Sequence, residues 1–313
     1  MITWQDIASE AQQTELLNPG QGIDMVRRAA YSEFAKKSGR PLLVYATSFQ
    51  NPIKAANLGP LLSIDLNDKD GFQQIVDSIF DKKVDLLIHS PGGSAEATES
   101  LVEILRSKFT DIRIIVTGAA KSAATMLSMS GNSIIMSSAG ELGPIDPQIN
   151  LGGSYTPAGS LIEEFNKAAD EVKDDPEKLP VWLPILDKYP PALLTQCDNF
   201  LQLAKDLVKE WLEEYMFKGD AEKEKKAEKI AAYLANEKNT LSHARRIDYK
   251  ELKKLGAKVE QVEAMPNDFQ EALRKVHLSV IMTLDNTDAI KIYESSEGGA
   301  LIRTFTAIPP QAV

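Results

Sequence analysis

The sequence predicts an α/β fold in which a mainly parallel sheet is covered by helices on both faces. Short, continuous apolar runs alternate with segments whose apolar residues recur at helical spacing, and glycine-bearing corners follow some of the runs. Continuous apolar runs are typical of strands that are buried on both faces, as in parallel sheets. The chain has 313 residues, of which 43% are hydrophobic, and this is enough for a substantial core.

The expected elements begin with a polar N-terminal segment, residues 1–40, which forms one or two helices broken at "NPGQG" (18–22). From residue 41 onward, strands and helices are expected to alternate. The expected strands are "LLVYA" (42–46), "LLSIDL" (61–66), "VDLLIHS" (84–90), "IRIIVTG" (112–118) and "NSIIMSS" (132–138). The expected helices between them are "GFQQIVDSIF" (71–80), "SAEATESLVEILRSKF" (94–109) and one that begins near Ser122.

The second half of the chain is expected to be mostly helical. Residues 158–236 are charged and have helical spacing, and prolines interrupt them within 176–192. The Gly- and Pro-rich stretch 140–153 is expected to be a loop. The last expected elements are a helix and a short strand (247–262) and a hairpin turned at "EGG" (291–305). The predicted organisation is an N-terminal helical segment (1–40), an α/β core (41–157), a helical insertion (158–240), and a closing helix and strand with a C-terminal hairpin (241–313).

Composition and charge exclude several classes of function. The formal net charge is −10, which disfavours nucleic acid and anionic membranes as partners. We expect no membrane span, because no apolar run reaches about 18 residues, and no signal peptide, because the N-terminus is polar and acidic. The single cysteine, Cys197, excludes an internal disulfide and favours a cytoplasmic location. The three histidines are widely separated, so we expect no zinc site. No other metal and no organic cofactor is implied.

The first corner with possible chemistry is "HSPGGSAEA" (89–97), which follows a predicted strand. Gly92 and Gly93 permit positive φ and close approach, so their N–H groups could point into a cavity and bind an oxyanion. The nucleotide-binding patterns GxGxxG and GxxxxGK[ST] are absent. The alternative interpretation of this corner is an ordinary tight turn before a helix.

The second corner is "GAAKSAATML" (118–127), which joins a predicted strand to a predicted helix. Ser122 stands there among small residues, which is what a nucleophilic serine needs if a carbonyl group is to reach it. The alternative role for Ser122 is that of a helix N-cap. The neighbouring Lys121 side chain is expected to leave the corner in another direction, toward substrate or solvent.

Together, "IHSPGGS" (88–94) and the segment from Ala119 through "LGPIDPQ" (142–148) resemble the ClpP/crotonase superfamily. The closer resemblance is to its serine dehydrogenase proteinase group, which is related to signal peptide peptidase A. It covers residues 40–155 and extends weakly to 240–259. The resemblance implies a ClpP-like fold with Ser122 as nucleophile, and an oxyanion hole formed by Gly92, Gly93 and Ala123.

The identity of the general base stays open. ClpP-type peptidases have a histidine roughly 25 positions after the serine, but here Asp146 lies 24 positions after Ser122. One hypothesis is an exchanged pair, with His243 as the base and Asp146 orienting it. The other is a Ser–Lys dyad with Lys167, which lies 45 positions after Ser122 and would need burial to depress its pKa.

The function predicted from these features is hydrolysis of peptide bonds through an acyl-enzyme on Ser122, with a peptide or protein as substrate. The resemblance also implies a homo-oligomer. Two alternatives belong to other classes of protein. One is a non-catalytic assembly protein of ClpP fold, because the base is unproven. The other is a crotonase-like acyl-CoA enzyme, which would use the same glycine pocket without a nucleophile.

Overall fold

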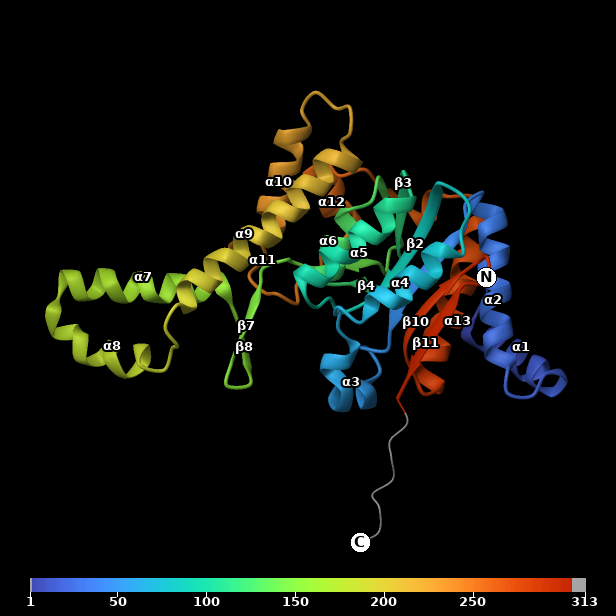
Figure 1. Cartoon of the computed structure of the whole chain (residues 1–313), viewed down its shortest axis with the longest axis horizontal. Coiled ribbons are helices and arrows are strands. Elements are labelled where there is room, and N and C mark those ends of the chain that lie inside the picture. Colours follow the sequence, from blue (N-terminus) through green and yellow to red (C-terminus); the bar gives the residue numbers. More distant parts are fainter. Residues whose placement is uncertain (1, 306–313) are drawn as a thin grey trace, which may run out of the picture.

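A central sheet organises the computed structural model, which describes residues 2–305 (Figure 1). Within these residues the sheet has seven strands in the order β11-β10-β1-β2-β3-β5-β9. Five of them run parallel, and the hairpin β10–β11 joins the β1 side antiparallel. Their bounds are β1 Leu42–Thr47, β2 Lys83–His89, β3 Asp111–Val116, β5 Ser133–Met136, β9 Val259–Gln261, β10 Ala289–Ser295 and β11 Ala300–Thr304. This arrangement confirms the predicted α/β fold with a mainly parallel sheet.

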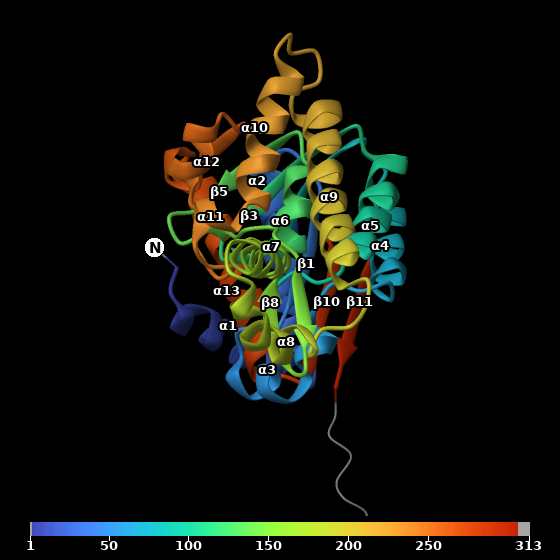
Figure 2. The same cartoon turned by 90° about the vertical axis from the view of Figure 1, so that its left-hand side faces the viewer.

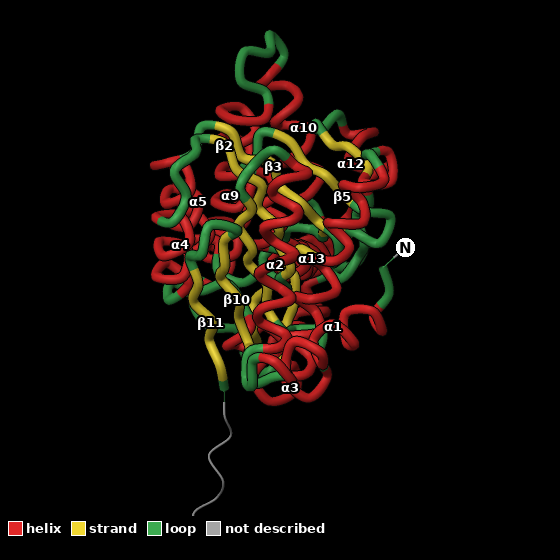
Figure 3. The backbone as a smooth tube through the Cα atoms, turned by 90° about the vertical axis from the view of Figure 1, so that its right-hand side faces the viewer, coloured by secondary structure: helices red, strands yellow, loops and turns green. Residues whose placement is uncertain are grey.

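Helices cover both faces of the sheet, and each face has its own hydrophobic cluster. Side chains alternate between the faces along each strand. In β2, Leu86 faces the helices α4, α5 and α6, whereas Leu87 faces α2 and α13. Figure 3 shows α2 and α13 side by side over the second face. The bounds are α2 Gly22–Ser38, α4 Asp68–Asp77, α5 Ala95–Lys108, α6 Ala123–Met129 and α13 Asn267–Asn286.

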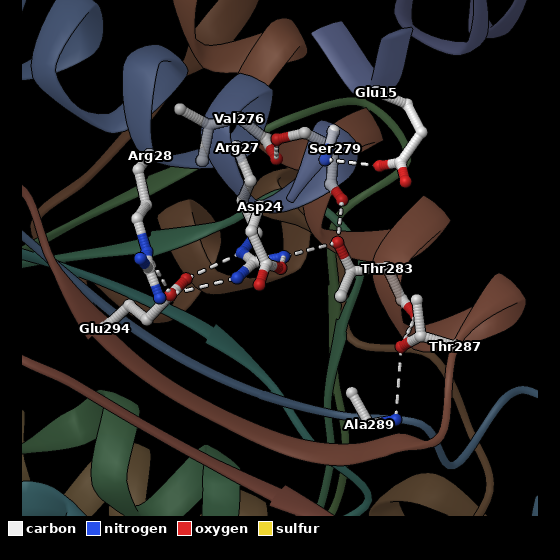
Figure 4. A network of polar contacts seen from close by, with 11 residues as sticks. Glu15, Asp24, Arg27, Arg28, Val276, Ser279, Thr283, Thr287, Ala289 and Glu294 are labelled. Carbon is white, nitrogen blue, oxygen red and sulfur yellow. Dashed lines mark hydrogen bonds and ion pairs between the residues drawn. The ribbon is translucent and has the colours of Figure 1, made fainter. Parts of the chain in front are cut away.

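A buried ion pair ties α2 and α13 to the sheet (Figure 4). The guanidinium group of Arg27 donates two hydrogen bonds to Glu294 on β10, at 2.6 and 2.9 Å. It also donates to Asp24 and to Thr283 on α13, both at 2.7 Å. Arg28 donates to the same Glu294 carboxylate at 3.0 Å. Removing one partner of such a pair would leave an uncompensated buried charge, so the network fixes how these elements dock.

Residues 158–240 form a helical arm, which projects from the sheet and returns to it (Figures 1 and 2). Its outer part has a small core of its own, in which Leu161 packs with Leu193 and Cys197. Its inner part, where α9 ends and α10 follows, packs on the first face of the sheet. The bounds are α7 Ala158–Asp174, α8 Leu179–Leu186, α9 Leu193–Trp211, α10 Lys223–Ala235 and α11 Glu237–Thr240.

Two predicted elements are wrong. Residues 61–66 are not a strand, because Gly59 and Pro60 start the 3-10 helix η1 (Gly59–Leu62), and Ile64 forms only a single bridge, to Gly93. Residues 140–153 are not simply a loop. They contain β6 (Glu141–Leu142) and the first strand of the hairpin β7 (Gln148–Leu151) and β8 (Ser154–Pro157). Gly152 and Gly153 form the two-residue turn with φ of 62° and 94°, which a glycine pair adopts at no steric cost.

The remaining predictions agree with the structure at both ends of the chain. Two helices precede the sheet, and they are separated at residues 18–21. Near the C-terminus, the predicted helix ends at Gly256, and the hairpin turns at residues 297–299. The further helices are α1 Trp4–Leu17, α3 Pro52–Leu58 and α12 Tyr249–Leu255. Among residues 2–305, no helix combines the length and the apolar character needed to cross a membrane.

Candidate active site

The glycine corner lies at the carboxyl end of β2, directly before α5. Ser94 caps α5 by accepting the N–H of Ala97 at 3.0 Å. Gly92 and Gly93 have φ of 95° and 155°, which residues with a side chain rarely adopt. The Gly92 N–H donates to the Ser90 hydroxyl at 3.2 Å. Within residues 2–305 the Gly93 N–H donates to no other group, so it is the free donor of the pair.

Ser122 lies at the junction between β4 (Ala119–Ala120) and α6, in a strained backbone conformation. Its φ is 50° and its ψ is −120°, which is unusual for any residue other than glycine. Ser122 occupies the N-cap position of α6, but its side chain makes no capping hydrogen bond. The N-cap interpretation of this serine is therefore wrong, and the hydroxyl is not used by the helix.

The glycine corner and the serine corner touch each other. Backbone hydrogen bonds join the two corners through a parallel bridge between Ser90 and Ala120. A Cβ atom added to Gly92 would then lie 2.7 Å from Ser122 Cβ and 2.8 Å from Ala123 N. Only glycine permits this approach. Like the Gly93 N–H, the Ala123 N–H donates to no other residue within the described part of the chain.

The loop after β5 brings a third group of residues beside the serine corner. Leu142 pairs with Ala120 on one side and exchanges two backbone hydrogen bonds with Ile247 on the other, at 2.9 and 3.0 Å. Asp146 and His243 each lie four residues from this isolated antiparallel bridge, on the two segments that it joins. His243 Nδ1 is 2.9 Å from Asp146 Oδ1. The sequence hypothesis paired these two residues, which are 97 positions apart.

The Asp146 carboxylate is held on both sides. Its side chain is 1% exposed, whereas that of His243 is 29% exposed. Asp146 Oδ2 accepts a hydrogen bond from Gln148 Nε2 at 2.6 Å. Gln148 was not singled out from the sequence, although its position two residues after Asp146 is the kind of local signal that could have found it. The arrangement leaves one carboxylate oxygen for His243.

The two lysines discussed above lie in different surroundings. The Lys121 side chain turns toward the segment after β5, where its Nζ donates to Leu142 O at 3.2 Å and pairs with Glu141 at 3.3 Å. Lys167 lies on α7 in the helical arm. Its side chain is 67% exposed, and its Nζ is 4.0 Å from Glu171. Within residues 2–305, no group of three or more His, Cys, Asp or Glu side chains is placed to hold a metal ion.

These features define the class of the protein. It is an α/β protein with a mainly parallel sheet, and a strained serine lies against a glycine corner at the carboxyl edge of that sheet. The sequence model of the ClpP-like SDH-type serine proteinases matches residues 61–278, which is more than half of the chain. The chain belongs to the ClpP-like SDH-type serine proteinase family, and its fold is the ClpP-like fold that the sequence resemblance implied.

Similar proteins occur in Methanocaldococcus jannaschii. Its uncharacterized proteins MJ1495 and MJ0137 are 34% and 35% identical to this chain over 95 residues. The matched residues are 30% of this chain and 31% and 32% of those proteins. The chain therefore spans about a third of the length of the curated relatives it matches.

Two solved structures resemble the chain at low identity. One is a mutant of the 1510-N membrane-bound stomatin-specific protease, 16% identical with a TM-score of 0.41, covering 68% of this chain and 79% of that one. The other is a second mutant of the same protease in complex with a substrate peptide, 15% identical with a TM-score of 0.35, covering 70% of this chain and 94% of that one.

Proposed function

We propose that the chain is a serine peptidase that hydrolyses peptide bonds through an acyl-enzyme on Ser122. The observation that carries the proposal is the conformation of this serine, which is strained, caps no helix and touches Gly92. A serine with a purely structural role at a helix start would use its hydroxyl as the cap and would need no positive φ. Membership of a serine proteinase family supports the same proposal.

In the proposed reaction, Ser122 Oγ attacks the carbonyl carbon of the scissile bond, and its proton passes to His243 Nε2. The charge that develops on the carbonyl oxygen is stabilised by the N–H groups of Gly93 and Ala123, which have no other acceptor within residues 2–305. The C–N bond then breaks, and the amine leaves with the proton held by His243. Water attacks the ester in the same way, which releases the acid and restores the Ser122 hydroxyl.

The role of Gly92 in this proposal differs from that of Gly93. Both N–H groups were expected to serve as oxyanion donors, but the Gly92 N–H already donates to Ser90. Gly92 instead provides the space in which Ser122 and Ala123 approach the corner. We therefore assign the donor role to Gly93 and Ala123.

We propose His243 as the base, oriented by Asp146. The support is the hydrogen bond from imidazole to a buried carboxylate, which fixes the ring and favours the tautomer with its other nitrogen free. The rival base, Lys167, is exposed and lies beside Glu171. A lysine acts as a base when burial disfavours its charged form, and an exposed amine lacks that burial.

A fluorophosphonate probe tests the proposal, because it reacts with activated serines and leaves ordinary ones intact. We expect intact-mass analysis to show one adduct on the wild-type chain and none on Ser122→Ala. Hydrolysis of a casein substrate should follow the same pattern. Labelling at another residue, or hydrolysis that survives in Ser122→Ala, would contradict the assignment. Turnover of acyl-CoA without labelling would favour the crotonase-like alternative, and inertness in all assays would favour the assembly protein.

Three finer points also stay proposals: a peptide or protein substrate, self-association and a cytoplasmic location. Self-association is compatible with the apolar side chains that α8 exposes, namely Leu179, Val181 and Leu183. Light scattering of the purified chain over a range of concentrations would measure its oligomeric state directly.

A further inference from the structure

A buried carboxylate, Asp68, collects donors from three elements beneath the glycine corner. Its side chain is 0% exposed. One oxygen accepts from Lys291 Nζ at 2.6 Å and from the Tyr293 hydroxyl at 2.5 Å. The other accepts from the Tyr45 hydroxyl at 2.9 Å and from the Asp65 N–H at 3.1 Å. Every lone pair that faces the protein is therefore used, and the carboxylate has a single orientation.

Lys291 extends this cluster to the segment before Asp68. Its side chain is 2% exposed and comes from β10, next to Tyr293. Besides the Asp68 carboxylate, its Nζ donates to the Ser63 carbonyl at 2.7 Å. The residue that follows Ser63 is Ile64, so the lysine fixes the backbone on the N-terminal side of Ile64.

Ile64 in turn holds the glycine corner. Its N–H donates to the Gly92 carbonyl at 2.7 Å, and its carbonyl accepts the Ser94 N–H at 3.0 Å. Gly93 lies between these two bonds, and a Cβ atom there would approach Ile64 O to 2.2 Å. The backbone of Ile64 thus clamps the corner on both sides of Gly93, while the Gly93 N–H itself stays free.

We propose that Lys291 is a positioning residue for the oxyanion hole, acting through Ser63 and Ile64 on Gly93. The inference rests on the proposed function, in which Gly93 is an oxyanion donor. It adds a part of the chain that the family match does not include, since the match ends at residue 278 and β10 begins at Ala289. In this arrangement the C-terminal hairpin acts on the site indirectly, through Ser63 and Ile64.

The choice of side chains supports a positioning role over a stabilising one. Burying a lysine and an aspartate is costly, and an apolar pair of similar volume is often at least as stable. What a fully hydrogen-bonded pair offers is a fixed geometry.

The test compares Lys291→Met with a matched control, Glu294→Gln. Glu294 is equally buried, lies on the same strand and contacts Arg27 on the opposite face, away from the glycine corner. Kinetics on one peptide substrate should be measured well below the melting temperature of each variant. A peptide boronate should be included, because its tetrahedral adduct places an oxygen in the oxyanion hole.

We expect Lys291→Met to lower kcat about ten-fold or more with KM within about two-fold, and to weaken boronate binding by a similar factor. Glu294→Gln should lose thermal stability without this change in kcat. Equal effects of both variants on kcat, or an effect on KM alone, would overturn the proposal. If Lys291→Met fails to fold, Tyr45→Phe decides instead, since it removes one donor to Asp68 and keeps the ring; an unchanged kcat there counts against the proposal.

The wild-type chain and Ser122→Ala, measured in the same series, report the proposed function separately. If wild type neither hydrolyses the peptide nor binds the boronate, the peptidase assignment fails. Hydrogen exchange of the peptides spanning residues 61–66 and 90–95 then tests the positioning itself. Faster exchange in Lys291→Met than in Glu294→Gln would support the clamp, and equal exchange would overturn it.

Discussion

Two corners of the molecule carry histidine, and their surroundings are opposite. At one corner, His243 is partly exposed, and its imidazole contacts the buried Asp146 carboxylate at 2.9 Å. At the other, His89 ends β2 and His277 lies on α13; both rings approach Gly118, and the His89 ring packs against Phe49. His277 Nδ1 is 3.0 Å from the Thr117 hydroxyl, and the buried His89 Nδ1 has no partner in the described part of the chain.

The consequence for protonation is large. Burial lowers the pKa of His89 to about 3, with a smaller contribution from the nearby His277. Burial likewise lowers the pKa of His277 to about 4, assisted by the Arg274 charge. These two rings stay neutral at any ordinary pH. A carboxylate can stabilise the cation of a histidine that stores a proton during turnover, and among the three histidines only His243 contacts one within residues 2–305. The comparison therefore separates a candidate catalytic corner from a structural one.

The largest expected effect is that of Ser122→Ala, which tests whether Ser122 is the nucleophile. Hydrolysis should fall by about 10⁴-fold or more, since the bond-forming atom is removed. The free energy of unfolding should change by less than about 1 kcal/mol, because the serine makes no capping bond. Ser122→Gly should be inactive as well, but more stable than Ser122→Ala by about 1 kcal/mol, because glycine tolerates a φ of 50°. Peptide hydrolysis and urea unfolding measure the two quantities.

The next prediction distinguishes the two candidate general bases, His243 and Lys167. His243→Ala should lower kcat about 10²-fold or more, which is the usual scale for loss of a general base. Lys167→Ala should leave kcat unchanged, because this lysine is exposed on the helical arm. His277→Gln serves as the matched control at the buried pair of His89 and His277. It should lower the free energy of unfolding without changing kcat below the melting temperature. If Lys167→Ala loses activity and His243→Ala keeps it, the Ser–Lys dyad replaces our assignment.

A smaller but more local change is Gly92→Ala. The new Cβ would lie 2.5 Å from Lys121 O and 2.7 Å from Ser122 Cβ, and φ is 95°. The serine corner must therefore move, and we expect kcat to fall about ten-fold to a hundred-fold, with a stability loss of about 1–3 kcal/mol. Gly256→Ala, at a helix end with φ of 103° and open space, is the control for strain alone. An effect on kcat equal to that of the control would remove Gly92 from the site.

The sequence predicted the two corners for a physical reason. Glycines with positive φ and small residues beside a serine are requirements of the backbone, and they are visible in a short window. The strands were predicted for a similar reason, since β1, β2 and β3 are buried on both faces and leave continuous apolar runs. Residues 61–66 have the same apolar pattern, but Gly59 and Pro60 start a 3-10 helix that the pattern does not reveal.

Contacts between distant segments were harder to predict. No helix or strand was predicted for residues 263–290, although α13 covers a whole face of the sheet together with α2. The pairing of Asp146 with His243 came from a family resemblance and not from any local pattern. Lys291 and Asp68 look like surface residues in the sequence, because charged side chains are usually exposed. Their burial depends on the antiparallel strand β10 lying against β1, which no local signal specifies.

The last prediction concerns acid stability and tests the corner of His89 and His277 without any activity assay. In the unfolded chain, His89 and His277 have a pKa near 6.5, whereas the folded values are about 3 and about 4. Between about pH 6.5 and 4 the unfolded state therefore binds more protons, and the stability of the folded state rises with pH. Each histidine should remove about 2 kcal/mol from the free energy of unfolding when the pH falls from 7 to 5. Urea unfolding at pH 7, 6 and 5 measures this slope. In His277→Gln the free energy of unfolding should fall by about 2 kcal/mol less than in wild type over this range, because one of the two buried histidines no longer titrates and every other titrating group is shared. Equal slopes in wild type and His277→Gln would contradict the assignment of His277 as a buried, neutral ring.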